Sequence, residues 1–273
     1  MNTMVYNAII DVYARGGATK EVSALLKSME KDEVQQDDIT KSIVAKSYCM
    51  TGELDRAMEH FRSLPATPNA NTVIVFNTIL DGCVRHNRFE LADDLLANMQ
   101  TYRIEPTNFT LGIIVKMWGR RRQLAEAFKA YRNLPKKYGF TPNGPVRTCL
   151  FFACLRNDNV AGALEVFDDL RNTGHPLDSK VYSALISRCV KDGILEKAVF
   201  LVEEAYGLAP GSKRVLPRGD NLEAQCIEQL VKSFTKQSCF RTMGASLVKN
   251  MKQANLPLSA QVLAMTSVDR RSP

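Results

Sequence analysis

Alanine recurs in this chain at an almost constant interval. The spacing is 35, 35, 36 and 35 residues along the series Ala57, Ala92, Ala127, Ala163 and Ala198. Four positions after each alanine stands a large apolar residue: Phe61, Leu96, Tyr131, Phe167 and Val202. Self-similarity at a fixed period of about 20–50 residues is typical of repeat architectures. The period therefore predicts stacked units whose function lies on a repeated face, not in a single pocket.

Within each period the apolar residues follow the spacing of a helix twice, with a turn residue between the two runs. In the first repeat we expect helices at about 4–15 and 18–31, with Gly16 and Gly17 ending the first of them. In the third repeat Asn87 takes the place of the glycine, because asparagine tolerates a left-handed backbone. Each period therefore predicts a helix–turn–helix unit.

The sequence thus predicts an all-α fold, an α-solenoid of about six to seven stacked helix–turn–helix repeats. The repeats that we expect cover 3–37, 38–72, 73–107, 108–143, 144–178 and 179–205. An insert loop rich in glycine and proline follows at 206–221, then a divergent seventh repeat at 222–258 and a tail or further helix at 259–273. The chain enters its first repeat almost at once, so we expect that an N-terminal portion is missing.

Composition excludes several other classes of protein. The seven cysteines form no CxxC pair and the three histidines are scattered, so we expect reduced core thiols and no zinc site. No apolar run reaches the ~20 residues that span a membrane. We find no arrangement typical of a catalytic triad, phosphate loop or metal cluster, and expect neither an enzyme nor a cofactor.

Positive charge gathers on the first helix of each pair, in a chain of net charge +7. Five cations share one phase near the end of that helix: Arg15, Arg85, Arg120, Arg156 and Lys191. Lys236 continues the series after the insert, and Met50 interrupts it. A cation at this place interacts favourably with the helix dipole. A row of such cations can also follow the phosphates of a nucleic acid, so both interpretations stay open.

Three segments identify the nearest family. VYNAIIDVYARGG, VFNTILDGCVRHN and VYSALISRCVKDG resemble pentatricopeptide repeats of the simple class, which keep about 35 residues throughout. The resemblance is strong over 3–205 and weak over 222–258. The tetratricopeptide repeat is the competitor, but its Trp-Leu-Gly-Tyr pattern is absent and its 34-residue period drifts out of phase.

The resemblance implies binding of single-stranded RNA on the concave face, about one base per repeat, in a mitochondrion or chloroplast. The base-reading pairs that it implies are Asn7 with Asp37, Ser42 with Thr72 (or Asn71 if the register slips), Asn77 with Thr107, Gly112 with Asn143, and Thr148 with Asp178. Ser183 would read with a partner hidden by the insert. The base-sandwiching residues would be Met4, Ile39, Ile74 and Phe109, and the cation row would contact phosphates.

The implied pairs differ in what they would read. Asn7 with Asp37 resembles a uridine reader, and Thr148 with Asp178 a guanine reader, whereas Gly112 has no side chain to offer. We expect an RNA-binding protein that acts in transcript stabilisation, processing or translation, with other proteins of such a complex as further partners. The alternative is a protein–protein scaffold subunit of an organellar complex.

Overall fold

The computed structural model describes residues 1–62, 70–101, 103–209, 211, 213–217, 219–236 and 241–267. Over these ranges the chain is all-helical, as predicted, and it has an α-solenoid fold. The side chains of Asn71 and Lys236, and all of Cys239, lie outside the described residues. The chain divides into two compact units, residues 1–153 and 154–273, and each is described by itself.

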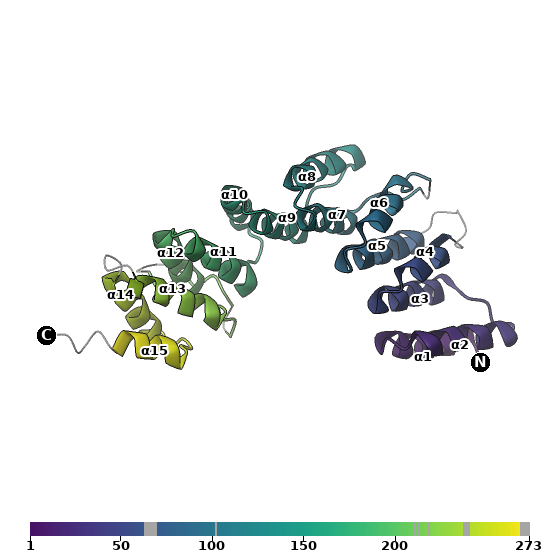
Figure 1. The fold of residues 1–273 in the computed structure, drawn as a ribbon, viewed down its shortest axis with the longest axis horizontal. Coiled ribbons are helices and arrows are strands. Elements are labelled where there is room, and N and C mark those ends of the chain that lie inside the picture. Colours follow the sequence, from purple (N-terminus) through teal and green to yellow (C-terminus); the bar gives the residue numbers. More distant parts are fainter. Residues whose placement is uncertain are drawn as a thin grey trace. The chain divides into compact units, whose positions relative to one another are not determined.

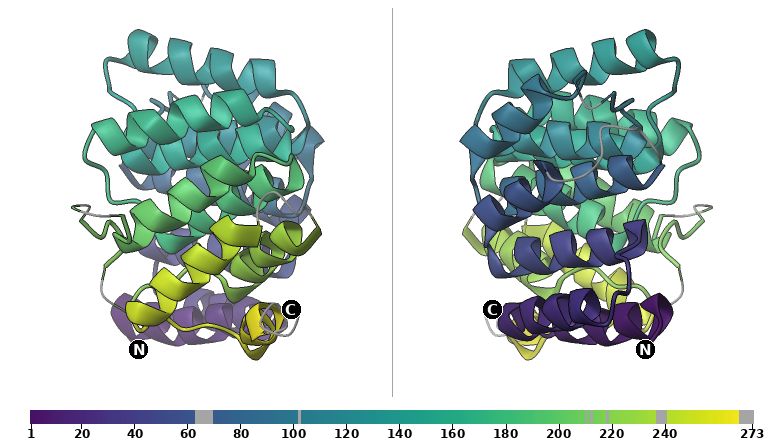
Figure 2. Two further views of the ribbon diagram at one scale, coloured as in Figure 1. Left: turned by 90° about the vertical axis from the view of Figure 1, so that its left-hand side faces the viewer. Right: turned by 90° about the vertical axis from the view of Figure 1, so that its right-hand side faces the viewer.

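Unit 1 consists of helix pairs (Figure 1). The first helices are α1 (Thr3–Arg15), α3 (Asp38–Thr51), α5 (Ala70–Arg85) and α7 (Asn108–Arg120), and the second helices are α2 (Thr19–Lys31), α4 (Leu54–Arg62), α6 (Phe89–Ala97) and α8 (Leu124–Tyr138). Each second helix packs on the first helix before it, and the first helices pack on one another in chain order. The right-hand view of Figure 2 shows this stacking from the purple to the blue helices. The first helices thus form one layer of the unit.

Turn and cap residues explain where these helices begin and end. Asp37 caps the start of α3 and Thr107 the start of α7, each by accepting the backbone N–H three residues later. Gly52 ends α3 with a φ of 81°, and Asn87 follows α5 with a φ of 57°, as its type predicted. α5 begins three residues before the predicted 73, so Thr72 lies inside this helix.

The core explains the alanine series. All five recurring alanines have no exposed surface, and each lies in a second helix or its equivalent in unit 2. A small side chain at this place lets the second helix approach its neighbours closely, while the aromatic or aliphatic residue one turn later fills the adjacent space. Phe61 and Phe167, for example, are 1% exposed. The period is therefore a packing period.

Unit 2 begins within α9 (Gly144–Arg156), whose residues up to Ala153 belong to unit 1. Its further helices are α10 (Val160–Asn172), α11 (Ser179–Lys191), α12 (Leu195–Tyr206), α13 (Ala224–Lys236), α14 (Arg241–Gln253) and α15 (Ala260–Ser267). α11 packs on α12 and α13, and α13 also contacts α14 and α15.

The insert between α12 and α13 has a defined structure in its described part. The Arg214 guanidinium donates to the carbonyl oxygens of Leu216, Pro217 and Asp220, and it stacks over the Tyr206 ring. The Tyr206 hydroxyl accepts the N–H of Leu222 at 2.8 Å. The insert is therefore held to the end of α12 and leads directly into α13.

Candidate nucleic-acid interface

Large apolar side chains stand exposed near the start of four first helices. Their exposed fractions lie between 53% and 79%, at Met4, Ile39, Ile74 and Phe109. Three positions later, on the same helix face, come the predicted base readers. Two of these, Asn7 and Asn77, are polar yet only 8% and 5% exposed. In most proteins apolar side chains are buried and polar side chains are exposed. The opposite arrangement, seen at these positions, is typical of a binding surface.

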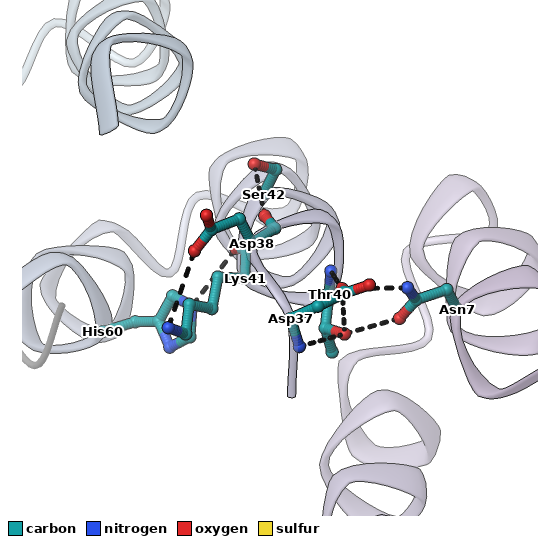
Figure 3. A network of polar contacts seen from close by, with 7 residues as sticks. All are labelled: Asn7, Asp37, Asp38, Thr40, Lys41, Ser42 and His60. Atoms are coloured by element: carbon teal, nitrogen blue, oxygen red, sulfur yellow. Dashed lines mark hydrogen bonds and ion pairs between the residues drawn. The ribbon is translucent and has the colours of Figure 1, made fainter. Parts of the chain in front are cut away.

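The first predicted pair, Asn7 and Asp37, meets in space across thirty residues of sequence (Figure 3). The Asn7 Nδ2 donates to Asp37 Oδ1 at 3.0 Å. The buried Thr40 hydroxyl lies between them, 2.6 Å from Asn7 Oδ1 and 2.8 Å from Asp37 Oδ1, and accepts the Asp37 N–H at 3.3 Å. α1 and α3 are thus joined by a polar network at the start of α3. The repeat pattern alone assigned no role to Thr40.

The charge of Asp37 follows from the same contacts. Slight burial disfavours its carboxylate, but hydrogen bonds from the Thr40 N–H and the Asn7 side chain outweigh this and hold the pKa of Asp37 below its usual value. Asp37 is exposed to solvent and ionised at neutral pH. It therefore offers a ligand only hydrogen-bond acceptors, whereas the Asn7 amide offers both kinds of group.

The second predicted reader, Ser42, is half-buried on α3 (Figure 3). Its hydroxyl donates to the Asp38 carbonyl oxygen one turn earlier, at 2.9 Å. Its predicted partner Thr72 is buried within α5, and the alternative partner Asn71 lies outside the described side chains. Nearby, His60 bonds the Lys41 carbonyl oxygen at 3.1 Å, and burial lowers the pKa of His60. Ser42 and Thr72 are thus half-buried and buried, respectively, whereas Asp37 and Thr107 in the neighbouring pairs are exposed.

The third reader, Asn77, has a buried carbonyl oxygen, Oδ1, with no hydrogen-bond partner among the described residues. The position equivalent to Thr40 is Thr110, which is also fully buried. Its hydroxyl lies 3.3 Å from that of Thr107 and accepts the Thr107 N–H at 3.1 Å. A buried oxygen without a hydrogen-bond donor lowers the stability of the fold unless a ligand or water donates to it. The Asn77 oxygen can therefore accept a hydrogen bond from a ligand.

Gly112 and Asn143 form the fourth pair. A Cβ added at Gly112 would lie 3.7 Å from Cys149 Sγ and 4.0 Å from Val146 Cγ2, an ordinary contact distance. Space for a side chain therefore exists although the residue is glycine. The Asn143 Oδ1 accepts the Val146 N–H at 3.2 Å at the start of α9.

The next reading positions lie on both sides of the unit boundary. Thr148 is half-buried in unit 1. Asp178 belongs to unit 2, where it is exposed and caps α11 through the Val181 N–H. Ser183 is 2% exposed, and its hydroxyl accepts the Glu223 N–H at 2.9 Å.

Glu223 is a residue that the sequence pattern missed. It directly precedes α13, as Asp37 precedes α3 and Thr107 precedes α7, and its side chain is exposed. It therefore holds the place of the hidden partner of Ser183. A fixed period could not locate Glu223 because the insert shifts the register of the repeat. The residue before the following helix could have been used to locate it instead.

The predicted phosphate-contacting cations already have protein partners in several repeats. Arg15 pairs with Asp11 at 2.5 Å and Arg85 with Asp81 at 3.0 Å, both one turn earlier on the same helix. The Arg120 guanidinium donates to the Val84 and Arg85 carbonyl oxygens at 2.8 and 3.2 Å, and so binds the end of α5 rather than of its own helix. Arg120 therefore interacts with the negative C-terminal end of the dipole of α5, although it belongs to α7.

The last two cations of the row differ in setting. Lys191 is exposed at the end of α11. Arg156 ends α9 and has a protein contact of its own. Exposed ion pairs such as those of Arg15 and Arg85 contribute little stability, so a phosphate can compete for these side chains.

Comparison with known families decides the identity of the repeat. A model of the PPR repeat matches residues 4–34 and 180–205, and a model of the PPR repeat family matches residues 71–120. The chain contains repeats of the PPR family. PPR stands for pentatricopeptide repeat, so the resemblance of its first, third and sixth repeats is confirmed.

The curated relatives are distant and longer PPR proteins. The pentatricopeptide repeat-containing protein At1g03540 of Arabidopsis thaliana is 20% identical over 215 residues, covering 78% of this chain and 33% of that protein. At5g03800 of the same plant is 28% identical over 200 residues, covering 72% of this chain and 21% of that protein. At3g09040, named as mitochondrial, is 22% identical and is covered to 18%. The PPR chain thus spans a third or less of these relatives.

Among solved structures the PPR chain is similar to the pentatricopeptide repeat protein PPR10 from maize. That match has a TM-score of 0.60 and 21% identity, and it covers 97% of this chain and 41% of PPR10. A second structure of PPR10, in complex with an 18-nt psaJ RNA element, matches with a TM-score of 0.44. The first match shows the fold.

Metal-binding groups, long apolar helices and cysteines were compared over the described part of the chain. Its residues include no group of three or more side chains arranged to hold a metal ion. None of its helices is long and apolar enough to cross a bilayer. Its six cysteines are free thiols, and burial raises the pKa of Cys49, Cys83 and Cys226 to about 12. Such thiols stay protonated and are poor nucleophiles.

Proposed function

We propose that this chain binds single-stranded RNA along the layer of first helices and reads about one base per repeat. The observation that carries the proposal is the recurring unit of an exposed apolar side chain followed by a buried polar one, at Met4 and Asn7 and again at Ile74 and Asn77. An exposed apolar side chain can cover the face of a base, and an amide can bond its edge. Single-stranded RNA offers both surfaces because its bases are splayed out.

The fold supports the proposal from a second side. PPR10, whose fold this chain shares, has been crystallised in complex with an 18-nt psaJ RNA element. Repeats of nearly constant length further support membership of the simple class. Names of relatives such as At3g09040 support action in mitochondria, and the role that we propose is stabilisation, processing or translation of an organellar transcript. The chain would act by occupying RNA, without catalysis.

The pairs differ in the hydrogen-bonding groups that they can offer to a base. Asn7 with Asp37 offers an amide and a carboxylate that already face each other, and Asn77 offers a carbonyl oxygen without a protein donor. Ser42 with Thr72 is enclosed, and Gly112 has no side chain. We therefore expect strong preference at two bases of the bound strand and weak preference between and after them.

Selection of bound sequences from a randomised single-stranded RNA pool tests this function. Asn77→Ala should remove the preference at one position and keep it elsewhere, because that residue contacts one base. Ser28→Ala, an exposed hydroxyl on the second helix α2, is the matched control and should leave the selected sequences unchanged. Failure of wild-type protein to enrich any sequence, or identical preferences in Asn77→Ala, would rule out base reading by this row.

One observation favours a scaffold role as the second candidate. In the described part of the insert, Arg214 holds the backbone at the Leu216, Pro217 and Asp220 carbonyl oxygens, and Val215 is 44% exposed. A protein partner that covers Val215 would bury this apolar surface. Co-purification of a stoichiometric protein complex that survives ribonuclease treatment and is lost in Val215→Asp would support this role.

A further inference from the structure

The second helix α8 differs in charge from the other second helices of unit 1. It carries four basic residues and one acidic residue, whereas α6 carries three acidic residues and neither lysine nor arginine. The charges of α2 and α4 are nearly balanced, with three lysines against two glutamates in α2 and two arginines against two acidic residues in α4. Positive charge in this layer is therefore concentrated on the helix that packs on α7 (Figure 1).

The cations of α8 lie on the side of the helix that faces away from α7. The buried Ala127 and the partly buried Leu134 belong to the opposite side, which packs on the core of unit 1. The four cations are exposed and spaced at three, four and one residues: Lys129, Arg132, Lys136 and Lys137. This spacing places them on one face of the helix, over a length of about 10 Å.

Ion pairs between neighbouring repeats neutralise many charges of the other second helices. The Arg62 guanidinium of α4 lies 3.0 Å from the Asp94 carboxylate of α6. The Arg121 guanidinium, at the end of α7, lies 2.7 Å from the Asp93 carboxylate of the same helix. The acidic charge of α6 is thus matched within unit 1.

The charge of α8 is not matched in this way. Lys129 pairs with Glu126 one turn earlier, at 3.4 Å. Arg132, Lys136 and Lys137 have no acidic partner in the part of the chain that the structure describes. The helix dipole accounts for cations in the last turn, such as Lys136 and Lys137, but not for Arg132 one turn before them. The face therefore offers positive charge to a ligand.

Aromatic rings lie beneath two of these cations. The guanidinium carbon of Arg132 lies 5.6 Å from the centre of the Phe128 ring, and the Lys137 ammonium lies 5.2 Å from the centre of the Tyr138 ring. Arginine, tyrosine and phenylalanine are enriched in protein–protein interfaces. A helix that binds a membrane surface instead presents large apolar side chains, and no large apolar side chain of α8 is exposed. The composition of the face thus favours a protein partner.

We propose that the exposed cations of α8 form a docking surface for an acidic segment of a partner protein, with Arg132 at its centre. A carboxylate can accept two parallel hydrogen bonds from a guanidinium. A partner helix whose acidic residues are three and four apart repeats the spacing of the cations. The surface belongs to a second helix, so the proposal does not rest on the proposed reading of RNA by the first helices.

Fluorescence anisotropy of the full chain with a labelled helical peptide, whose glutamates are three and four residues apart, tests the surface. The glutamate peptide should bind at low salt, and the same peptide with glutamines should not. Arg132→Glu combined with Lys136→Glu should weaken binding about tenfold or more, while thermal unfolding shows a folded protein.

Lys27→Glu combined with Lys31→Glu is the matched control. These exposed lysines lie three periods earlier, at the equivalent places of α2, and their replacement changes the net charge by the same amount. The control should bind the peptide like wild type, because Ala24 and Asp32 stand on α2 and after it where α8 has Lys129 and Lys137.

Single-stranded RNA binding by the same variants separates this proposal from the proposed function. Loss of the peptide with unchanged RNA affinity in the α8 variant supports the docking surface. The proposal is overturned if the glutamate peptide does not bind, or if the α8 variant and its control lose it equally. It is also overturned if the α8 variant keeps the peptide but loses duplex RNA, vesicles of phosphatidylcholine and phosphatidylserine, or self-association of the chain.

Discussion

At the scale of single residues, Asn7 and Asn77 occupy equivalent places and meet different partners. The Asn7 oxygen receives the hydroxyl of Thr40, whereas the Asn77 oxygen has no donor among the described residues. The second member of a pair is an N-cap in most repeats, which explains why Asp, Asn and Thr recur there. The position caps a helix, and under the proposed function a base would use its remaining acceptor capacity.

The network around Thr40 makes a stability prediction. Thr40→Val should lower the free energy of unfolding by about 1–3 kcal/mol, because it leaves the buried Asn7 oxygen without its donor. Thr110→Val is the matched control and should cost less, since the Thr110 hydroxyl contacts only Thr107 among the described residues. Urea unfolding of both variants measures the difference. Equal losses would contradict a bridging role for Thr40.

Asp37 makes a prediction about pH. Its folded-state pKa lies below the usual value of about 3.9, so the carboxylate stabilises the fold above that pH, and the contribution is lost as the pH falls through the folded-state pKa. The stability advantage of wild type over Asp37→Asn should be constant near neutral pH and shrink below about pH 4. Urea titrations of both proteins over this range measure it. A difference independent of pH would contradict the ionic contacts of Asp37.

At the scale of elements, α7 carries two glycines with opposite surroundings. The site of a Cβ at Gly112 has ordinary contacts, whereas a Cβ at Gly119 would lie only 2.7 Å from Ala153 Cβ and 3.1 Å from its Cα. Gly119 thus permits a close approach of α7 and α9 within unit 1, and Gly112 does not. The missing reader of the fourth repeat is therefore not explained by lack of space.

These glycines form a matched pair for substitution. Gly112→Ala should raise the free energy of unfolding by about 0.5–1 kcal/mol, because alanine loses less backbone freedom in a helix. Gly119→Ala should lower it by about 1–3 kcal/mol, because the new methyl group forces the helices apart. Thermal and urea unfolding measure both. Stabilisation by Gly119→Ala would contradict the close packing of α7 and α9.

The elements could be predicted because their signals are local. Apolar spacing and turn residues such as Gly52 and Asn87 act within a few residues, so the helices follow directly. The contacts of the site are not local. Thr40 reaches Asn7 only because α1 and α3 pack together, and Arg120 binds the carbonyl end of the neighbouring α5. Glu223 was missed because the insert displaces it from the constant period.

At the scale of the whole molecule, the account depends on the repetition of weak contacts along the first helices. Each of the first three repeats offers an exposed apolar side chain and a polar pair, and most first helices end in a cation, none of which would hold RNA alone. Under the proposed function, those of stacked first helices within a unit would sum to a site that follows a strand. The net charge of +7 favours such a polyanion, and the affinity should therefore fall as salt displaces the phosphates.

The most direct test of this account is the affinity of the chain for a randomised single-stranded RNA, measured by fluorescence anisotropy over a range of salt concentrations, with duplex RNA of equal length as the control. We predict binding at micromolar protein or below that weakens steadily with salt and is much weaker for the duplex, whose bases are stacked and paired. Absence of binding at micromolar protein and low salt, or equal affinity for the duplex, would contradict it.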